Sequence, residues 1–257
     1  MNKSGFVVLL VMNFFKLFFK YLFKILFSKE PFLVEVDGIK LLLPKHSLDV
    51  LIPAETFLDK NYEPLFKPSK NPKLVIDLGS HVGDFSIWAS RRFKNSKIIA
   101  VEMDKYLYKL LNQNLVLNKV KNTIVTINKA VHRTSNMRIN IQRVPILTAA
   151  NLETKIKTSF TAETISLNDL YLLGGNKIID FLKIDIEGAE KYLLTSEYKN
   201  FFRYKVRFVA IECHRFSGVW PKEAEKYFKS IGFITKFQKI TSLNILNELL
   251  HAKNKNL

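Results

Sequence analysis

Short apolar runs alternate with amphipathic segments from residue 73 onward. Five runs predict β-strands, at residues 74–76, 98–101, 124–127, 181–186 and 206–211. Residues 84–93 and 105–118, between the first three runs, are predicted helices. Short, continuously apolar strands are typical of a parallel sheet that is buried on both faces. Their alternation with helices predicts an α/β, Rossmann-like fold with a doubly wound, mostly parallel sheet.

The segment before this alternation reads as a β-rich lead-in. Residues 32–36 and 39–43 flank Asp37-Gly38, a two-residue signal for a hairpin turn. A connection rich in proline and lysine follows at residues 67–72 and marks a boundary. Farther along, residues 137–167 are less helical, and we expect an insertion there over one sheet edge, with strands at 137–141 and 164–167. The expected organisation is therefore an N-terminal helix at 1–30, a lead-in at 31–72 and a main domain at 73–257.

The N-terminal stretch, residues 5–27, is almost wholly apolar. Lys16, Lys20 and Lys24 recur every four residues and share one helical face. Because these lysines lie inside the apolar run and no small-residue cleavage site follows, a signal peptide is disfavoured. An amphipathic helix lying in the membrane surface accommodates them best, with a single span as the second choice and a helix packed on the domain as the third. Either membrane reading places the main domain on the cytoplasmic side.

The charge balance points to an anionic partner without identifying it. The chain has 40 basic and 23 acidic side chains, a formal net charge of +17. Nucleic acid, an acidic membrane leaflet and a phosphorylated substrate all remain open, as does a merely solubilising surface. Cys213 is the one cysteine of the sequence, which excludes an internal disulfide framework and a cysteine-rich zinc site.

A glycine motif follows the first predicted strand. Asp77 ends this strand, Gly79 and Gly83 follow in a G-x-x-x-G spacing, and we expect Asp84 to cap the next helix. A dinucleotide site uses G-x-G-x-x-G, which is absent. An acid at this strand end suits a cation, and S-adenosylmethionine carries an ammonium and a sulfonium. We expect the cofactor to bind at this motif, with the residues between the glycines contributing: Ser80 and His81.

A second acid closes the next predicted strand. Glu102 lies 25 residues after Asp77, and an acid in this place accepts the ribose hydroxyls of an adenosine cofactor. The alternative is a purely structural role, in which Glu102 caps the strand end and pairs with a lysine. Asn128, directly after the strand at 124–127, completes the candidate cofactor-binding residues.

Charged side chains gather at the ends of the last two predicted strands. Lys183, Asp185 and Glu187 alternate and should point to one side of a strand, and Glu212 and His214 follow the next. Three charges on one face of a buried strand are costly unless they are paired or functional. Carboxyl ends of parallel strands share one sheet edge, where ligands bind.

These motifs together resemble the signature of the FkbM-type methyltransferases. In that family a strand similar to residues 163–170 precedes a run like Lys183-Ile-Asp-Ile-Glu-Gly-Ala-Glu190. The glycine motif and the Glu-x-His at 212–214 match in order and spacing, and the resemblance covers about residues 70–235. Two departures are Asn168, where the family usually has an acid, and Thr195-Ser196, where a glycine is common.

The resemblance implies a class I methyltransferase fold, with a seven-stranded sheet whose last strand is antiparallel. It also implies S-adenosylmethionine as methyl donor and a hydroxyl of a sugar, glycolipid or natural product as acceptor. We expect His214 or Asp185 to be the base, Glu187 to orient the acceptor and Lys183 to tune the cluster. No residue is assigned to a metal, although Asp185 and Glu212 leave a Mg²⁺ ion open.

An RNA methyltransferase is the alternative function, favoured by the basic surface. Enzymes that methylate nucleobase amines resemble one another in an N/D-P-P-Y/F turn after this strand. Here the turn reads Asp185-Ile-Glu-Gly188, which lacks the proline and the aromatic residue. We therefore expect no specific nucleic-acid partner.

Overall fold

The computed structural model describes residues 21, 31–44, 53–58, 60–66, 71–142, 159–215, 218–239 and 248–257. These residues form a seven-stranded mixed sheet. In spatial order its strands are β11 (Phe233–Lys239), β12 (Glu248–Asn254), β10 (Phe208–Cys213), β9 (Phe181–Ile184), β3 (Leu74–Leu78), β4 (Lys97–Val101) and β5 (Ile124–Ile127).

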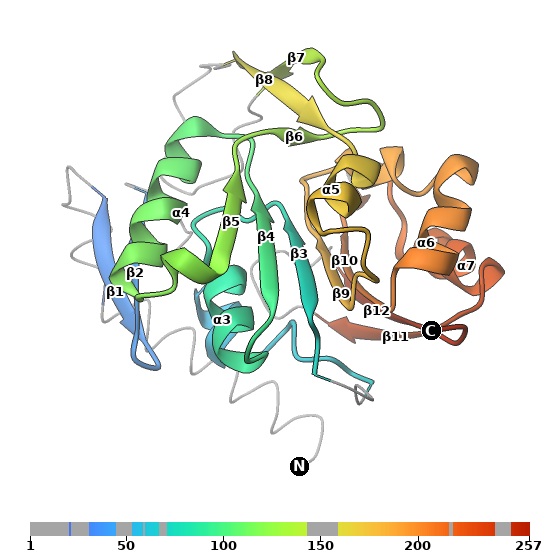
Figure 1. Ribbon diagram of the computed structural model, residues 1–257, viewed down its shortest axis with the longest axis horizontal. Helices are drawn as coiled ribbons and strands as arrows, with labels where there is room; N and C mark the ends of the chain where they lie inside the picture. The colour runs from blue at the N-terminus through green and yellow to red at the C-terminus, as the bar shows by residue number, and fades with distance from the viewer. Residues whose placement is uncertain are drawn as a thin grey trace.

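The strand directions confirm the predicted sheet (Figure 1). Within the described part of the chain, β10, β9, β3, β4 and β5 run parallel, and β12 lies antiparallel between β10 and β11. All five predicted strands exist, with bounds shifted by up to two residues. The last of them starts at Phe208 because Val206 makes only an isolated bridge to Ile179.

Helices cover both faces of the sheet, as the alternation predicted. α3 (Asp84–Arg92) and α4 (Lys105–Leu117) pack on one face, where Ile98 and Ala100 point. α5 (Leu167–Leu173), α6 (Lys199–Lys205) and α7 (Pro221–Ser230) pack on the other, with Ile99 and Val101. The two cores are separate because successive strand residues point to opposite faces.

The lead-in shares the first of these cores. The hairpin of β1 (Phe32–Val36) and β2 (Ile39–Leu43) is confirmed, with positive φ at Asp37 and Gly38. Beyond the hairpin, the described residues of the lead-in include a π-helix at Ala54–Leu58 and no further strand. Val34, Leu41, Phe57 and Tyr62 are buried in the same cluster as the sheet residue Val75. The lead-in is thus packed into the main domain.

The predicted N-terminal helix lies outside the described residues, except for Tyr21. This side chain is 6% exposed, and its hydroxyl accepts from the Glu35 amide at 2.9 Å and donates to the Glu35 carbonyl at 3.2 Å. At this position the N-terminal stretch therefore contacts β1. In the described part of the chain, no helix is both long and apolar enough to cross a membrane.

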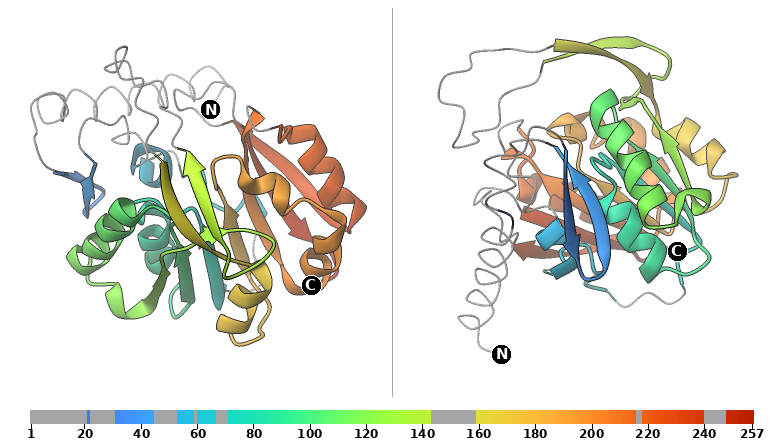
Figure 2. Two further views of the ribbon diagram at one scale, coloured as in Figure 1. Left: turned by 90° about the horizontal axis from the view of Figure 1, so that it is seen from above. Right: turned by 90° about the vertical axis from the view of Figure 1, so that its left-hand side faces the viewer.

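Three strands that follow β5 in the chain form a small sheet beyond its carboxyl end (Figures 1 and 2). Its strand order is β6 (Ala130–Val131), β8 (Ser159–Ile165) and β7 (Arg138–Gln142). The strand expected at 164–167 ends at Ile165, because Ser166 caps α5 by accepting from the Asp169 amide. A cavity of about 400 Å³ lies where β8 approaches the start of α4; its lining residues are Asp104, Lys105, Tyr106, Phe160 and Thr161.

Candidate active site

Lys183 is the centre of a buried charge cluster that joins β3 and β9. It is paired in register with Asp77, and its Nζ lies 3.3 Å from Asp77 Oδ1 and 3.2 Å from Asp185 Oδ2. The same Nζ donates to the Gly79 carbonyl at 2.8 Å. Burial lowers the pKa of Lys183, but the charges of Asp185, Asp77 and Asp84 outweigh it and raise the pKa above its usual value. Lys183 is therefore a fixed cation that ties the glycine loop to the acidic strand end.

Asp77 lies near the end of β3, two residues before Gly79 of the glycine loop. It is fully buried, and its second oxygen accepts from the Ser86 hydroxyl at 2.6 Å. In the structure this carboxylate contacts Lys183 and Ser86, and its place beside a cationic cofactor stays a prediction. Asp84 also differs from expectation: Gly83 stands at the N-cap of α3, and Asp84 accepts from the Thr56 hydroxyl at 2.5 Å.

Both motif glycines are required by the backbone and by their neighbours. Gly79 has φ of 78°, and a Cβ there would lie 1.7 Å from the Asp185 carbonyl oxygen. Gly83 has φ of 90°, and its Cβ would lie 2.4 Å from a methyl of Leu111. The amides of Gly79 and Ser80 donate to the Val101 carbonyl at 3.0 and 2.9 Å. The side of Gly79 on which a Cβ would lie is thus filled by the Asp185 carbonyl, in the turn after β9.

Glu102 faces the glycine loop at the end of β4. Its two carboxylate oxygens accept from the amides of His81 and Asp104, at 2.9 and 2.8 Å. Burial raises the pKa of Glu102 to about 7, against the opposing effect of His81. Asn128 supports this turn by donating to the carbonyls of Glu102 and Met103. The hydrogen-bond donors to Glu102 are thus backbone amides, where the alternative interpretation expected a lysine.

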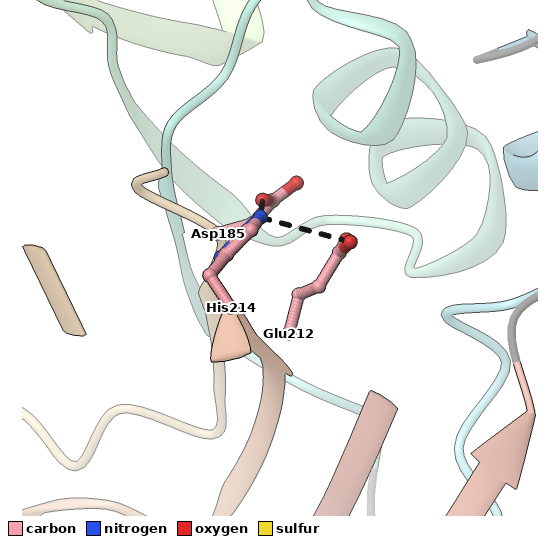
Figure 3. Close-up of side chains that lie close together, drawn as sticks. All are labelled: Asp185, Glu212 and His214. Atoms are coloured by element: carbon pink, nitrogen blue, oxygen red, sulfur yellow. Dashed lines mark ion pairs between the residues drawn. The ribbon is translucent and has the colours of Figure 1, made fainter. Parts of the chain in front are cut away.

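His214 lies among four carboxylates at the ends of β9 and β10. Its Nδ1 is 2.9 Å from Glu190 Oε1, and its Nε2 is 3.5 Å from Glu187, 3.7 Å from Glu212 and 3.8 Å from Asp185. Figure 3 shows the imidazole directed toward Asp185 and Glu212. Burial lowers the pKa of His214, but the Glu190 hydrogen bond and the neighbouring charges raise it to about 10. The surrounding carboxylates thus stabilise the protonated imidazole, which favours Asp185 over His214 as the base.

The prediction that Lys183, Asp185 and Glu187 alternate along one strand was wrong beyond Ile184. β9 ends at Ile184, and Glu187 and Gly188 have φ of 52° and 98°. The Ile186 amide donates to Glu190 Oε1 at 2.9 Å and closes this tight turn. The turn itself, and not a continued strand, brings Glu187 back toward His214.

Tyr62 is a site residue that the sequence did not reveal. It comes from the lead-in, is 8% exposed, and donates its hydroxyl to Asp185 Oδ2 at 3.3 Å. Its ring centroid lies 5.4 Å from the Nζ of Lys183. Burial and the charge of Asp185 raise the pKa of Tyr62 well above its usual value, so the phenol stays a donor. No local motif marks Tyr62, because its partners are more than 100 residues away in the chain.

Similarity to known proteins identifies the family of this chain. The family model of the methyltransferase FkbM domain matches residues 77–237. Methyltransferase sdnD of Sordaria araneosa is 26% identical over 237 residues, covering 80% of this chain and 90% of that protein. The chain therefore belongs to the FkbM methyltransferase family and is an S-adenosylmethionine-dependent methyltransferase.

Solved structures show the same fold. Methyltransferase FkbM from Methylobacillus flagellatus KT matches with a TM-score of 0.52 and 15% identity, over 79% of this chain and 52% of that one. A putative methyltransferase from Streptococcus mutans, described as dependent on S-adenosylmethionine, matches with a TM-score of 0.54 and 13% identity. That match covers 88% of this chain and 56% of the other. The chain thus spans little more than half the length of these two structures.

Proposed function

We propose that this enzyme methylates a hydroxyl oxygen of a sugar, a glycolipid or a related small molecule. The observation that carries the proposal is the group of carboxylates around His214, at the sheet edge beside the glycine loop. Asp185 and Glu187 are proton acceptors, as oxygen methylation requires. The turn between them lacks the N/D-P-P-Y/F pattern of enzymes that methylate nucleobase amines.

The residues at the ends of β3 and β4 fit the methyl donor. A carboxylate has about four acceptor sites, so Glu102 keeps sites for ribose hydroxyls after accepting from two backbone amides. The cavity lined by Asp104 begins beside it and has room for a planar base. When bound, S-adenosylmethionine supplies an electrophilic methyl group. We propose that residues 79–83 hold its amino-acid end and that Glu102 holds the ribose.

Within the site the residues divide the work of orientation and proton transfer. Lys183 fixes Asp185 at 3.2 Å, and Tyr62 holds the same oxygen at 3.3 Å. This leaves Asp185 Oδ1, the oxygen that faces His214, to accept the acceptor's proton. The side chain of Glu187 is 57% exposed and so reaches an incoming hydroxyl. A positioned base contributes on the order of 10²- to 10⁴-fold to the rate, and alignment contributes more.

Two measurements test this function. Isothermal titration with S-adenosylmethionine should give heat with the wild type and at least tenfold weaker binding with Glu102→Ala. Methyl-labelled cofactor is then offered to a membrane glycolipid extract and, separately, to RNA. Label in an alkali-stable ether of the glycolipid fraction supports the proposal. Label that enters RNA alone would establish the alternative, RNA methylation by a basic enzyme.

We further propose that residues 5–27 bring the enzyme to the cytoplasmic surface of a membrane. The support is the periodic set of Lys16, Lys20 and Lys24 in an apolar stretch. Deleting the segment would also remove Tyr21 from the core, so the sharper variant replaces the three lysines with glutamate. Wild type should bind vesicles with anionic lipid and the variant should not. Equal partitioning of the two proteins would refute the proposal.

A further inference from the structure

We propose that Asp185, Glu212 and His214 bind a divalent transition-metal ion. One ligand atom from each residue lies within 4.8 Å of the other two. The imidazole Nε2 is 3.8 Å from Asp185 Oδ1 and 3.7 Å from Glu212 Oε1. Figure 3 shows the three side chains converging from the ends of two neighbouring strands.

These separations suit a metal better than a direct hydrogen bond. Nitrogen and oxygen atoms that share a proton approach to about 2.7–3.2 Å. Ligand atoms that share a tetrahedral ion, with bonds of about 2.0–2.2 Å, are roughly 3.3–3.6 Å apart. Bringing the two imidazole–carboxylate pairs to those values requires movements of only a few tenths of an ångström.

The support of His214 is an observation independent of the acidic side chains. The imidazole is 2% exposed, and its Nδ1 is held by Glu190, which is fully buried. Metal-binding histidines in proteins typically donate their second nitrogen to a carboxylate in this way, which orients the ring and fixes its tautomer. Glu190 is itself fixed by the Ile186 amide at 2.9 Å. The ring is therefore held with Nε2 toward Asp185 and Glu212.

The charge around the imidazole also favours a doubly charged ion. Four carboxylates surround this one ring, from Asp185, Glu187, Glu190 and Glu212. Lys183 compensates Asp185 but is shared with Asp77. One imidazole nitrogen with two carboxylate oxygens is a ligand set for Zn²⁺ or Mn²⁺, since Mg²⁺ and Ca²⁺ prefer oxygen alone.

The consequence for catalysis rests on the proposed function. Three protein ligands leave a position open for the acceptor hydroxyl, and an ion lowers the pKa of a hydroxyl that it coordinates. With Asp185 engaged as a ligand of the ion, the O–H proton passes to the Glu187 carboxylate in place of Asp185. The oxygen forms the new bond to the methyl carbon, and the S–CH₃ electron pair stays on sulfur. The products are a methyl ether, S-adenosylhomocysteine and a proton, which leaves Glu187 for solvent.

Metal titration of the full-length protein tests the site directly. Zn²⁺ is followed by calorimetry and Mn²⁺ by electron paramagnetic resonance at pH 8, where the ion must displace the Nε2 proton that the surrounding carboxylates stabilise. We expect one ion per chain, and at least tenfold weaker binding in Asp185→Asn and in Glu212→Gln. Glu225→Gln is the control, because Glu225 lies on α7 and pairs with Lys229. Circular dichroism establishes that each variant is folded.

The results separate this inference from the proposed function. The metal site would be overturned if the wild type bound neither metal. It would also be overturned if Asp185→Asn and Glu212→Gln bound metal as tightly as the wild type. Full methyl transfer after chelation would overturn its catalytic role while leaving the acceptor assignment intact. Metal binding without methyl transfer to any hydroxyl would instead contradict the proposed function and leave the site standing.

Discussion

Gly79→Ala is the substitution that best tests how the glycine loop and the acidic turn are joined. An alanine at φ of 78° is in the left-handed region, at a cost of about 1–2 kcal/mol. Its Cβ would also lie 1.7 Å from the Asp185 carbonyl oxygen, so the backbone of one turn must move. Overpacking of this kind costs typically about 1–3 kcal/mol. The expected total is about 2–5 kcal/mol of the free energy of unfolding.

Gly175→Ala is the matched control. Gly175 has a similar φ of 83°, but nothing lies within 4 Å of a Cβ built there. Only the backbone cost of about 1–2 kcal/mol then applies. Urea unfolding followed by circular dichroism gives both values under identical conditions.

Function should separate the two variants further. Displacing the Asp185 turn moves the loop that Lys183 holds through the Gly79 carbonyl, so Gly79→Ala should weaken binding of S-adenosylmethionine at least tenfold. Gly175→Ala should leave it unchanged. If the two variants lose the same stability, within about 0.5 kcal/mol, and bind the cofactor equally, the close approach of the two loops is not what requires glycine at position 79.

Three further substitutions test the charges and hydrogen bonds of the site. Lys183→Met should cost about 3–5 kcal/mol in urea unfolding, because it strands Asp77 and Asp185 without their cation; a loss below 1 kcal/mol, the range for an exposed lysine, would show that the cluster is not a buried ion pair. Tyr62→Phe removes the donor to Asp185 but keeps the ring, so kcat should fall while the affinity for S-adenosylmethionine stays constant, and an unchanged kcat would remove Tyr62 from the site. Glu102→Gln tests the carboxyl whose pKa is raised from 4.5 to about 7. The folded chain holds this proton where the unfolded chain has lost it, so wild-type stability should fall as pH rises from about 4.5 through 7, by at most about 3 kcal/mol from this group. The variant should lack that part of the pH dependence, and identical pH profiles for the two proteins would contradict the assigned shift.

The residues that hold the site together are drawn from distant parts of the chain. Tyr62 reaches Asp185 from the lead-in, outside residues 77–237 that match the family model. Thr56, on the same lead-in, holds Asp84 at the start of α3. Burial raises the pKa of Asp84 to about 6, against the lowering effects of Lys183 and Thr56. The lead-in therefore contributes contacts to the candidate site from outside the part of the chain that matches the family model.

The sequence by itself determined the sheet and the edge at which the chemistry lies. Strands buried on both faces are mostly apolar along their whole length. The apolar runs at residues 74–76, 98–101 and 124–127 therefore predicted three strands of the sheet. Parallel strands also present their carboxyl ends at one edge. The acids that end β3, β4 and β10 were therefore expected together, and Glu102 lies within hydrogen-bond distance of the glycine loop.

Only the tertiary structure decided which charged groups meet. Asp77 pairs with Lys183, which is 106 residues away in the sequence, and both side chains are buried. Neither strand alone predicts this pair, because the register between two strands depends on both of them. Glu187 reaches His214 because the backbone turns back at positive φ, where the alternation of a strand had been expected. Periodicity is a property of neighbouring residues, whereas burial and charge pairing depend on contacts between segments that only folding brings together.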